Sequence, residues 1–370
     1  MMNALKNMKK TTRSNLITYG IVVVFYIVVQ ALTAGGLLNN SMKGMLVPIC
    51  TYVVLAISLN LTVGILGELS LGHAGFMSVG AFSGAVFWVV TGSQLPPALG
   101  LAVSMLIGGV VAGVFGFLIG IPVLRLRGDY LAIVTLAFGE IIKNVLNTVY
   151  LGIDSTGFHF SMKDSSSLGL APDGDVIING AIGISGMKKA STFLAGIILI
   201  LITLFVILNL INSRAGRAIM SIRDNRIAAE ATGINVTKYK LMAFIISATF
   251  AGMAGVLYAL NFSALAAKKF DYNTSILVLV FVVLGGIGNI RGSMIAATIL
   301  YVLPEMLRSV ADYRMLAYAV VLIVMMIFNQ SPQVIAWREQ MADRFAHNPV
   351  VKGLLAKFKK GGADRTKGEA

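Results

Sequence analysis

Charged residues and cysteine are scarce in this chain of 370 residues, and each scarcity excludes a class of protein. Charged residues make up 12%, whereas a soluble globular domain has roughly a quarter. Cys50 is the single cysteine, so neither an intrachain disulfide nor a cysteine-rich metal site can form. The dipeptide Gly-Lys is absent, which excludes a phosphate-binding loop and ATP hydrolysis by this polypeptide. The three histidines do not cluster, so we expect no metal ion, no cofactor and no catalytic triad.

Hydrophobic residues, by contrast, make up 57% of the chain and gather in long continuous runs. A membrane span needs about 20 mostly apolar residues, and these runs are too continuous for the alternating strands of a barrel. The sequence therefore predicts an all-α polytopic membrane protein, a bundle of about ten transmembrane segments. They lie at residues 16–35, 44–64, 70–91, 97–121, 129–150, 191–211, 241–262, 274–289, 293–308 and 314–328. The third, eighth and ninth are short or interrupted by glycine, which is typical of broken or re-entrant segments.

Positive charge orients the predicted bundle. The net charge of +14 comes from basic residues dispersed among the spans without interleaved aromatics, so a nucleic-acid partner is excluded. Most Lys and Arg fall on one side if the N-terminus is cytoplasmic, as expected when positive charge stays inside. Both termini are thus expected in the cytoplasm, with a short segment at 1–15, a transmembrane domain at 16–328 and a basic tail at 329–370. The first span lacks a clean cleavage site and is expected to be retained.

Two long connections between spans are candidates for contact with partners. Residues 212–240 carry Arg214, Arg217, Arg223, Arg226, Lys238 and Lys240. Lipid cannot solvate such charge, so this cytoplasmic loop lies in water and is long enough for a short helix along the membrane. Residues 151–190 form the largest external loop and are rich in Ser, Gly and Asp. This loop is either a flexible connector or a docking surface for an external partner.

Glycine-rich stretches mark a candidate pathway or gate. The stretch GILGELSLGHAGFMSVGAF places a carboxylate and a histidine beside apolar residues and three flexible glycines. Unwound backbone at membrane depth is tolerated where it lines a cavity, although a surface loop with His73 bonded to a neighbouring carbonyl is the alternative. A weak echo occurs in the glycine run near 285–292, and many transporters use paired broken helices. The candidate pathway residues are Gly64, Gly67, Glu68, Ser70, Gly72, His73, Gly75, Gly285, Gly286 and Gly288.

Other glycine pairs have a packing explanation. The spacings Gly80-x-x-x-Gly84, Gly109-x-x-x-Gly113 and Gly116-x-x-x-Gly120 predict close contact between helices.

Glu140 and Lys143 are an intramembrane charge pair, three residues apart on one face of a predicted helix. Such a pair is a functional candidate by default, and a buried structural pair is the equal alternative. An ion-coupled secondary transporter would use Glu140, Lys143 and Glu68 as a relay. That alternative leaves the charged loop at 212–240 without a role.

Four blocks of sequence resemble a known family. They are NLTVGILGELSLGHAGFMSVGAF, IPVLRLRGDYLAIVTLAFGEII, SRAGRAIMSIRDNRIAAEATGINVTKYKLMAFIISATFAGMAGVLYA and GGIGNIRGSMIAATIL followed by LPEMLR. From about residue 59 to 308 the chain resembles the M-type membrane permease subunit of bacterial ABC importers for branched-chain amino acids.

The resemblance implies a function in the cell membrane. In that family a polar loop with an EAA-like motif docks into the ATPase subunit, which here implies ATPase coupling by Arg223, Arg226, Glu230, Ala231 and Gly233. It further implies three kinds of partner: ABC ATPase subunits, a second related permease and an extracytoplasmic substrate-binding protein. The expected cargo is Leu, Ile or Val, with urea, short amides and other amino acids as alternatives. Glu68 departs from the family pattern, where Gln is more usual.

Overall fold

A computed structural model describes residues 10–36, 39–126, 128–172, 174–307, 316, 319–324 and 327. The chain divides into two compact units, Met1–Val302 and Leu303–Ala370, and the bundle described below belongs to the first. Most of the N-terminal segment 1–15, the whole tail 329–370 and residues 314–315, 317–318, 325–326 and 328 of the predicted tenth segment lie outside the described residues. The orientation of the termini stays a prediction.

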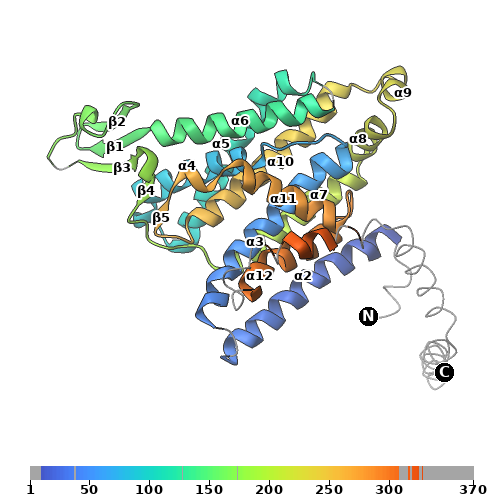
Figure 1. Ribbon diagram of the computed structural model, residues 1–370, viewed down its shortest axis with the longest axis horizontal. Coiled ribbons are helices and arrows are strands. Elements are labelled where there is room, and N and C mark those ends of the chain that lie inside the picture. Colours follow the sequence, from blue (N-terminus) through green and yellow to red (C-terminus); the bar gives the residue numbers. More distant parts are fainter. Residues whose placement is uncertain are drawn as a thin grey trace, which may run out of the picture. The chain divides into compact units, whose positions relative to one another are not determined.

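Among the described residues, seven helices are long and apolar enough to cross a membrane, which confirms the first seven predicted segments (Figure 1). They are α2 (Lys10–Ala34), α3 (Asn40–Asn60) with its π-helical extension (Leu61–Leu66), α4 (His73–Val90), α5 (Pro97–Val123), α6 (Asp129–Thr148), α7 (Phe193–Asn212) and α10 (Val236–Ala259). The eighth and ninth segments are the shorter helices α11 (Tyr272–Gly285) and α12 (Ile290–Met306). At 14 and 17 residues they fall below the length of a full span, so the described part of the chain does not confirm ten crossings.

The core of the bundle is the packing of α4 and α5 against α10. An added Cβ at Gly80 would lie 2.3 Å from the Cα of Gly252, and one at Gly252 would lie 2.6 Å from the carbonyl oxygen of Gly108. Such short separations exist only because all three residues lack a side chain. The predicted glycine pairs on α5 confirm the same interpretation, since Gly113 faces Thr249 and Gly116 faces Ala248 of α10.

The loop at 151–190, which is predicted to be external, is folded. This corrects the expectation of an all-α chain and argues against the flexible connector, one of the two alternatives for this loop. Three antiparallel strands form a sheet in the order β2-β1-β3. Their bounds are β1 (Tyr150–Asp154), β2 (Gly157–Ser161) and β3 (Asp175–Asn179). A second, two-stranded sheet pairs β4 (Ile184–Ser185) with β5 (Ala264–Leu265). Turn-forming Ser, Gly and Asp concealed these short strands, because each strand is only five residues or fewer.

Asp154 holds the turn of the three-stranded sheet together. One of its carboxylate oxygens accepts hydrogen bonds from the backbone and hydroxyl of Thr156, and the other accepts from the backbone N–H of Ala171. His159 adds a contact of 3.0 Å between its Nε2 and the same carboxylate. These donors, led by the Thr156 hydroxyl, lower the pKa of Asp154 below its ordinary value.

Candidate functional site

The charged loop at 212–240 folds into two short helices at the end of the bundle opposite the external sheet (Figure 1). They are α8 (Arg214–Asp224) and α9 (Arg226–Ala231). Each begins at a capping side chain: the Ser213 hydroxyl accepts from the N–H of Gly216, and the Asn225 side chain accepts from the N–H of Ala228. The predicted short helix is therefore present, as two helices with a break at Asn225.

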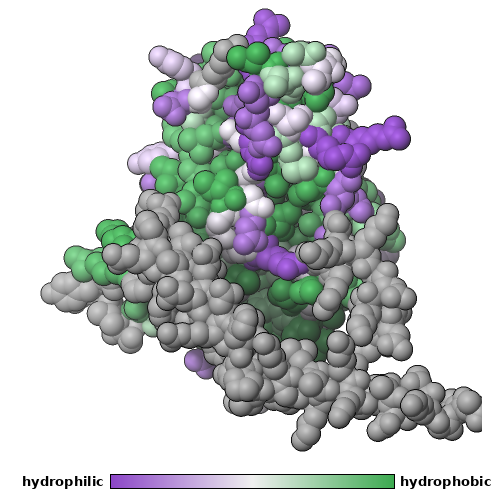
Figure 2. Space-filling model, turned by 90° about the vertical axis from the view of Figure 1, so that its right-hand side faces the viewer, coloured by the Kyte–Doolittle hydropathy of each residue, from purple (hydrophilic) through white to green (hydrophobic). Residues whose placement is uncertain are grey.

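A small apolar cluster makes this pair of helices a defined body. Ile222 of α8, Ala229 of α9 and Val236 of α10 are buried together, with Ile234 and Tyr239 packed against them. Seen from this end, hydrophilic residues gather beside apolar ones on the surface that carries α8 and α9 (Figure 2). We call α8 and α9, with the link up to Asn235, the cytoplasmic element, after the side of the membrane that the sequence predicts for it.

The outer helix of the cytoplasmic element presents a mixed surface. Glu230 accepts from Arg226 Nε at 2.9 Å, four residues earlier on α9. Between them in the sequence, Ile227 is 80% exposed, the largest exposed fraction of any large apolar side chain among the described residues. Gly233 ends the helix with φ of +82°, a backbone conformation that favours glycine, and Ala231 is exposed. The five residues implied by the resemblance thus belong to one element.

The inner helix, α8, directly contacts the first of the two glycine-rich interruptions between helices, residues 64–75, which we call the first glycine break; residues 285–292 are the second. Arg223 donates from Nη1 to the carbonyl oxygen of Gly64 at 3.1 Å and holds Asp224 at 2.9 Å. Its side chain also lies against Gly67, where an added Cβ would be 2.6 Å from Arg223 Cγ. Gly67 has φ of +79°, so this position favours glycine for both space and conformation. Arg223, a candidate coupling residue, therefore contacts Gly64 and Gly67, which are candidate pathway residues.

Glu68 forms an ion pair with Lys240 of α10. The Lys240 side chain is only 4% exposed and that of Glu68 is 16% exposed, so the pair is largely shielded from water. A cavity of about 460 Å³ opens beside it, between the cytoplasmic element and the segment after α3. Glu68, Gly67, Arg223, Ile227, Glu230 and Lys240 are among the residues that line it.

The first glycine break carries backbone groups that side chains of other helices satisfy. The N–H of Leu71 donates to the Thr135 hydroxyl of α6, and the N–H of Ala74 donates to the Ser275 hydroxyl of α11, both at 3.0 Å. Non-helical backbone inside a membrane protein requires such partners. Gly72 and Gly75 lie close to α6, since an added Cβ at Gly72 would be 2.4 Å from the carbonyl oxygen of Thr135.

The remaining polar groups at this break are buried. His73 is 2% exposed, and its Nε2 lies 2.9 Å from the Ser58 hydroxyl. Its partner is therefore a hydroxyl, whereas the surface-loop alternative requires a neighbouring carbonyl. Ser70 is also 2% exposed, and its hydroxyl has no hydrogen-bond partner among the described residues. No group of three His, Cys, Asp or Glu side chains that could hold a metal ion occurs in the described part of the chain.

The two glycine breaks, residues 64–75 and 285–292, lie side by side. Asn60 of α3 accepts at Oδ1 from the N–H of Gly288 at 2.9 Å, and its Nδ2 donates to the Ser293 hydroxyl at 2.8 Å. Gly64 contacts Gly288 so closely that an added Cβ would lie 2.3 Å from the Gly288 nitrogen. At the second break, Gly285 lies against Ser293, and Gly286 has φ of +94°.

Glu140 and Lys143 form the predicted ion pair on α6. Glu140 also accepts from the backbone N–H of Tyr272 at 3.0 Å, which ties the start of α11 to α6. This pair uses different helices from the Glu68–Lys240 pair. The geometry gives Glu140 a structural task at the α6–α11 contact, while its predicted role in transport stays a prediction.

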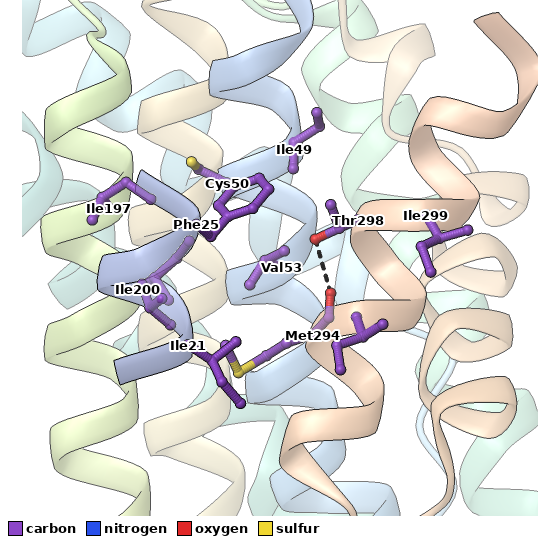
Figure 3. Close-up of a pocket in the computed structure, with 12 residues that line it drawn as sticks. Ile21, Phe25, Ile49, Cys50, Val53, Ile197, Ile200, Met294, Thr298 and Ile299 are labelled. Atoms are coloured by element: carbon purple, nitrogen blue, oxygen red, sulfur yellow. Dashed lines mark hydrogen bonds between the residues drawn. The ribbon is translucent and has the colours of Figure 1, made fainter. Parts of the chain in front are cut away.

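A separate cavity of about 180 Å³ lies among α2, α3, α7 and α12 (Figure 3). Its lining is apolar apart from Thr298, whose hydroxyl donates to the carbonyl oxygen of Met294 at 2.9 Å. A free amino acid carries an ammonium and a carboxylate, and these walls offer no charged group to pair with either. The cavity is therefore unsuited to such a solute.

Sequence reasoning missed three residues of this site. Lys240 was assigned to the solvated charge of the loop, Asn60 was placed inside an ordinary span, and Ile227 was not singled out. The available signal was Glu68, because a carboxylate in a place where Gln is more usual requires a cationic partner. For Asn60 the signal was a single side-chain amide in an apolar run, since a buried amide requires a hydrogen-bond partner on another helix.

The fold and the site define a polytopic helical protein of the cell membrane that carries a folded, charged element at one end of its bundle. The model of the family described as branched-chain amino acid transport system / permease component matches residues 41–329. The chain belongs to this family.

Individual relatives agree with this assignment. Over 291 residues the chain is 36% identical to the high-affinity branched-chain amino acid transport system permease protein LivM of Salmonella typhimurium, covering 75% of this chain and 66% of that relative. With LivM of Escherichia coli K12 the identity is 35% over 298 residues, with the same coverage of each chain. The chain thus spans just under two thirds of the length of these relatives. The nucleoside ABC transporter permease protein NupC of Lactococcus lactis is 24% identical over 197 residues, or 52% of this chain and 59% of that relative. No solved structure matches.

Proposed function

We propose that this chain is the permease subunit of an ATP-driven importer and forms half of the pathway for Leu, Ile and Val. Separate ATPase subunits drive it, a second related permease completes the pathway, and an external binding protein delivers the solute. The observation that carries this proposal is the cytoplasmic element, a compact body of charged helices in a chain of this permease family. ATP hydrolysis resides in the partner subunits.

The proposed ATPase contact is the outer surface of α9. The Arg226–Glu230 pair and the exposed Ile227 give this surface both charge and an apolar contact. An apolar side chain surrounded by polar residues is typical of a protein–protein contact. The cluster of Ile222, Ala229 and Val236 supports the proposal, because a packed body can transmit a push as a rigid unit.

The proposed contact for the binding protein is the external sheet. Phe158 and Phe160 are two residues apart on β2, so their side chains point to the same face of the sheet. Each side chain is 62% exposed. Exposed aromatic residues on a folded element are suited to a partner protein. The sheet and the cytoplasmic element lie at opposite ends of the bundle, as a carrier with two different partners requires (Figure 1).

The solute assignment rests on the relatives. Both LivM proteins are named for branched-chain amino acids, whereas NupC is named for nucleosides at lower identity. We therefore favour branched-chain amino acids over the other solutes. The ion-coupled alternative has less support, because its proposed relay residues lie in two separate ion pairs on different helices.

Reconstitution of the full complex tests this function. The chain is co-expressed with its ATPase and permease partners, placed in liposomes and supplied with the binding protein. We expect uptake of labelled leucine only with ATP, with competition by valine and isoleucine but not by urea or a nucleoside. The variant Glu230→Ala is expected to lose uptake. Lys43→Ala, an exposed charged residue of α3 outside both proposed contacts, is the matched control and is expected to keep it. Equal uptake without nucleotide would refute the ATP-driven function.

A further inference from the structure

Two side-chain contacts fasten the cytoplasmic element and the first turns of α10 to the segment that follows α3. Arg223 of α8 donates to the carbonyl oxygen of Gly64, and Lys240 of α10 pairs with Glu68. We infer that Arg223, Glu68 and Lys240 are the linkage through which movement of the cytoplasmic element reaches both glycine breaks. This inference rests on the proposed function, because it assumes that a partner moves the element.

The first contact is the hydrogen bond from Arg223 to the Gly64 carbonyl oxygen, and other interactions hold both of its partners in place. Arg223 divides its donors between Asp224, next to it in the chain, and the Gly64 carbonyl, so its guanidinium follows α8 closely. Gly64 lies in the π-helical turn Leu61–Leu66, and the N–H of Glu68 bonds back to the Thr62 carbonyl at 3.0 Å. A π-helical turn is a frequent feature of functional sites. A shift of α8 therefore acts on a backbone turn rather than on a loose loop.

The second contact, the Glu68–Lys240 ion pair, couples movement of α9 to the segment that follows α3. The chain leaves α9 at Gly233 and begins α10 at Val236, which belongs to the shared apolar cluster. Lys240 follows on the first turns of α10 and is almost fully buried, so its charge depends on Glu68 for a partner. Because Glu68 lies between the π-helical turn and α4, this pair anchors the link that leads to α4.

Asn60 extends the linkage to the second break. Its amide bonds both Gly288 and Ser293, and the turn that contains Gly64 packs on Gly288. One displacement of the π-helical turn thus disturbs the start of α12 as well as the start of α4. The path from α8 to both breaks consists of contacts between neighbouring groups, without a gap.

Charge reversal in the full reconstituted complex tests the linkage, with solute transported per ATP hydrolysed as the readout. Glu68→Lys or Lys240→Glu alone is expected to lower this ratio about tenfold, within the usual range for coupling between sites. The double variant Glu68→Lys/Lys240→Glu is expected to restore most of the ratio, since the pair is then reformed with opposite polarity. Lys238→Gln, two residues away and exposed, is the matched control and is expected to keep the wild-type ratio.

Three further outcomes decide the question. If the single variants fail to assemble, Arg223→Gln provides the second measurement, because this side chain is 39% exposed and its loss should lower the ratio without preventing assembly. A wild-type ratio in Arg223→Gln, or in both single charge reversals, overturns the linkage while leaving ATP-driven transport intact. Wild-type uptake without ATP overturns the proposed function itself, so the two failures are distinguishable.

Discussion

Replacement of Ile227 by alanine isolates the apolar part of the proposed ATPase contact. The change removes three carbon groups, and burial of each is worth about 0.8 kcal/mol. Because the side chain is 80% exposed before docking, about 2 kcal/mol of binding free energy is at stake, or roughly thirtyfold in Kd. The milder Ile227→Val change should cost roughly threefold on the same scale.

The assay is binding of the purified ATPase subunit to the permease pair in nanodiscs. Ile182→Ala is the matched control, because Ile182 is 63% exposed but belongs to the external region. We expect the thermal stability of both variants to equal that of the wild type, since neither side chain is part of the core. If Ile227→Ala leaves Kd within about twofold of the wild type, the ATPase does not bury this residue and the assignment of the α9 surface is wrong.

Three other changes test separate parts of the structure. Gly252→Ala places a methyl group 2.4 Å from the Cβ of Ala112, so we expect thermal unfolding in detergent to show a loss of about 1–3 kcal/mol, whereas Gly20→Ala in open space shows none. Asp154 has a pKa lowered by its hydrogen bonds, so its contribution to the external sheet is present above its ordinary pKa of 3.8 and is lost as the pH falls through the lowered value. Proteolysis of the sheet should therefore increase in the wild type as the pH falls below the ordinary pKa of 3.8, and Asp154→Asn should be sensitive already at neutral pH and show no such increase. Glu140→Gln keeps an acceptor for the Tyr272 N–H, so uptake should persist and remain insensitive to collapse of the proton gradient. Loss of uptake in this variant, together with gradient-dependent uptake by the wild type, would instead favour the ion-coupled alternative.

The spans were predictable because hydrophobic continuity is a local property of the chain. The predicted segments 97–121 and 129–150 correspond to α5 (Pro97–Val123) and α6 (Asp129–Thr148), with ends displaced by two residues or fewer. The glycine spacings also predicted helix contacts correctly. The lack of a side chain allows close approach of two backbones, whichever helix is the partner. Short strands in the external loop were missed, since Ser and Gly-rich segments look alike whether they are folded or not.

The ion pairs show where sequence reasoning stops. Glu140 and Lys143 are three residues apart, so their pairing follows from helix geometry alone. Glu68 and Lys240 are 172 residues apart, and nothing near either residue identifies the other. In the linear sequence Lys240 looks like one more basic residue of the loop. Only the packing of α10 against the end of α3 turns it from a solvated charge into a buried one.

The contacts around the glycine breaks favour a switch between discrete arrangements over gradual bending. Leu71, Ala74 and Gly288 donate backbone hydrogen bonds to side chains of other helices at 2.9–3.0 Å. Such bonds weaken steeply within a few tenths of an ångström, and a buried N–H left without a partner is destabilising. Glycine contacts at this density also leave no space for a helix to slide without repacking. A movement that opens a path here must therefore exchange one complete set of partners for another, and the linkage at Arg223 and Lys240 is where an external push would select between the two sets.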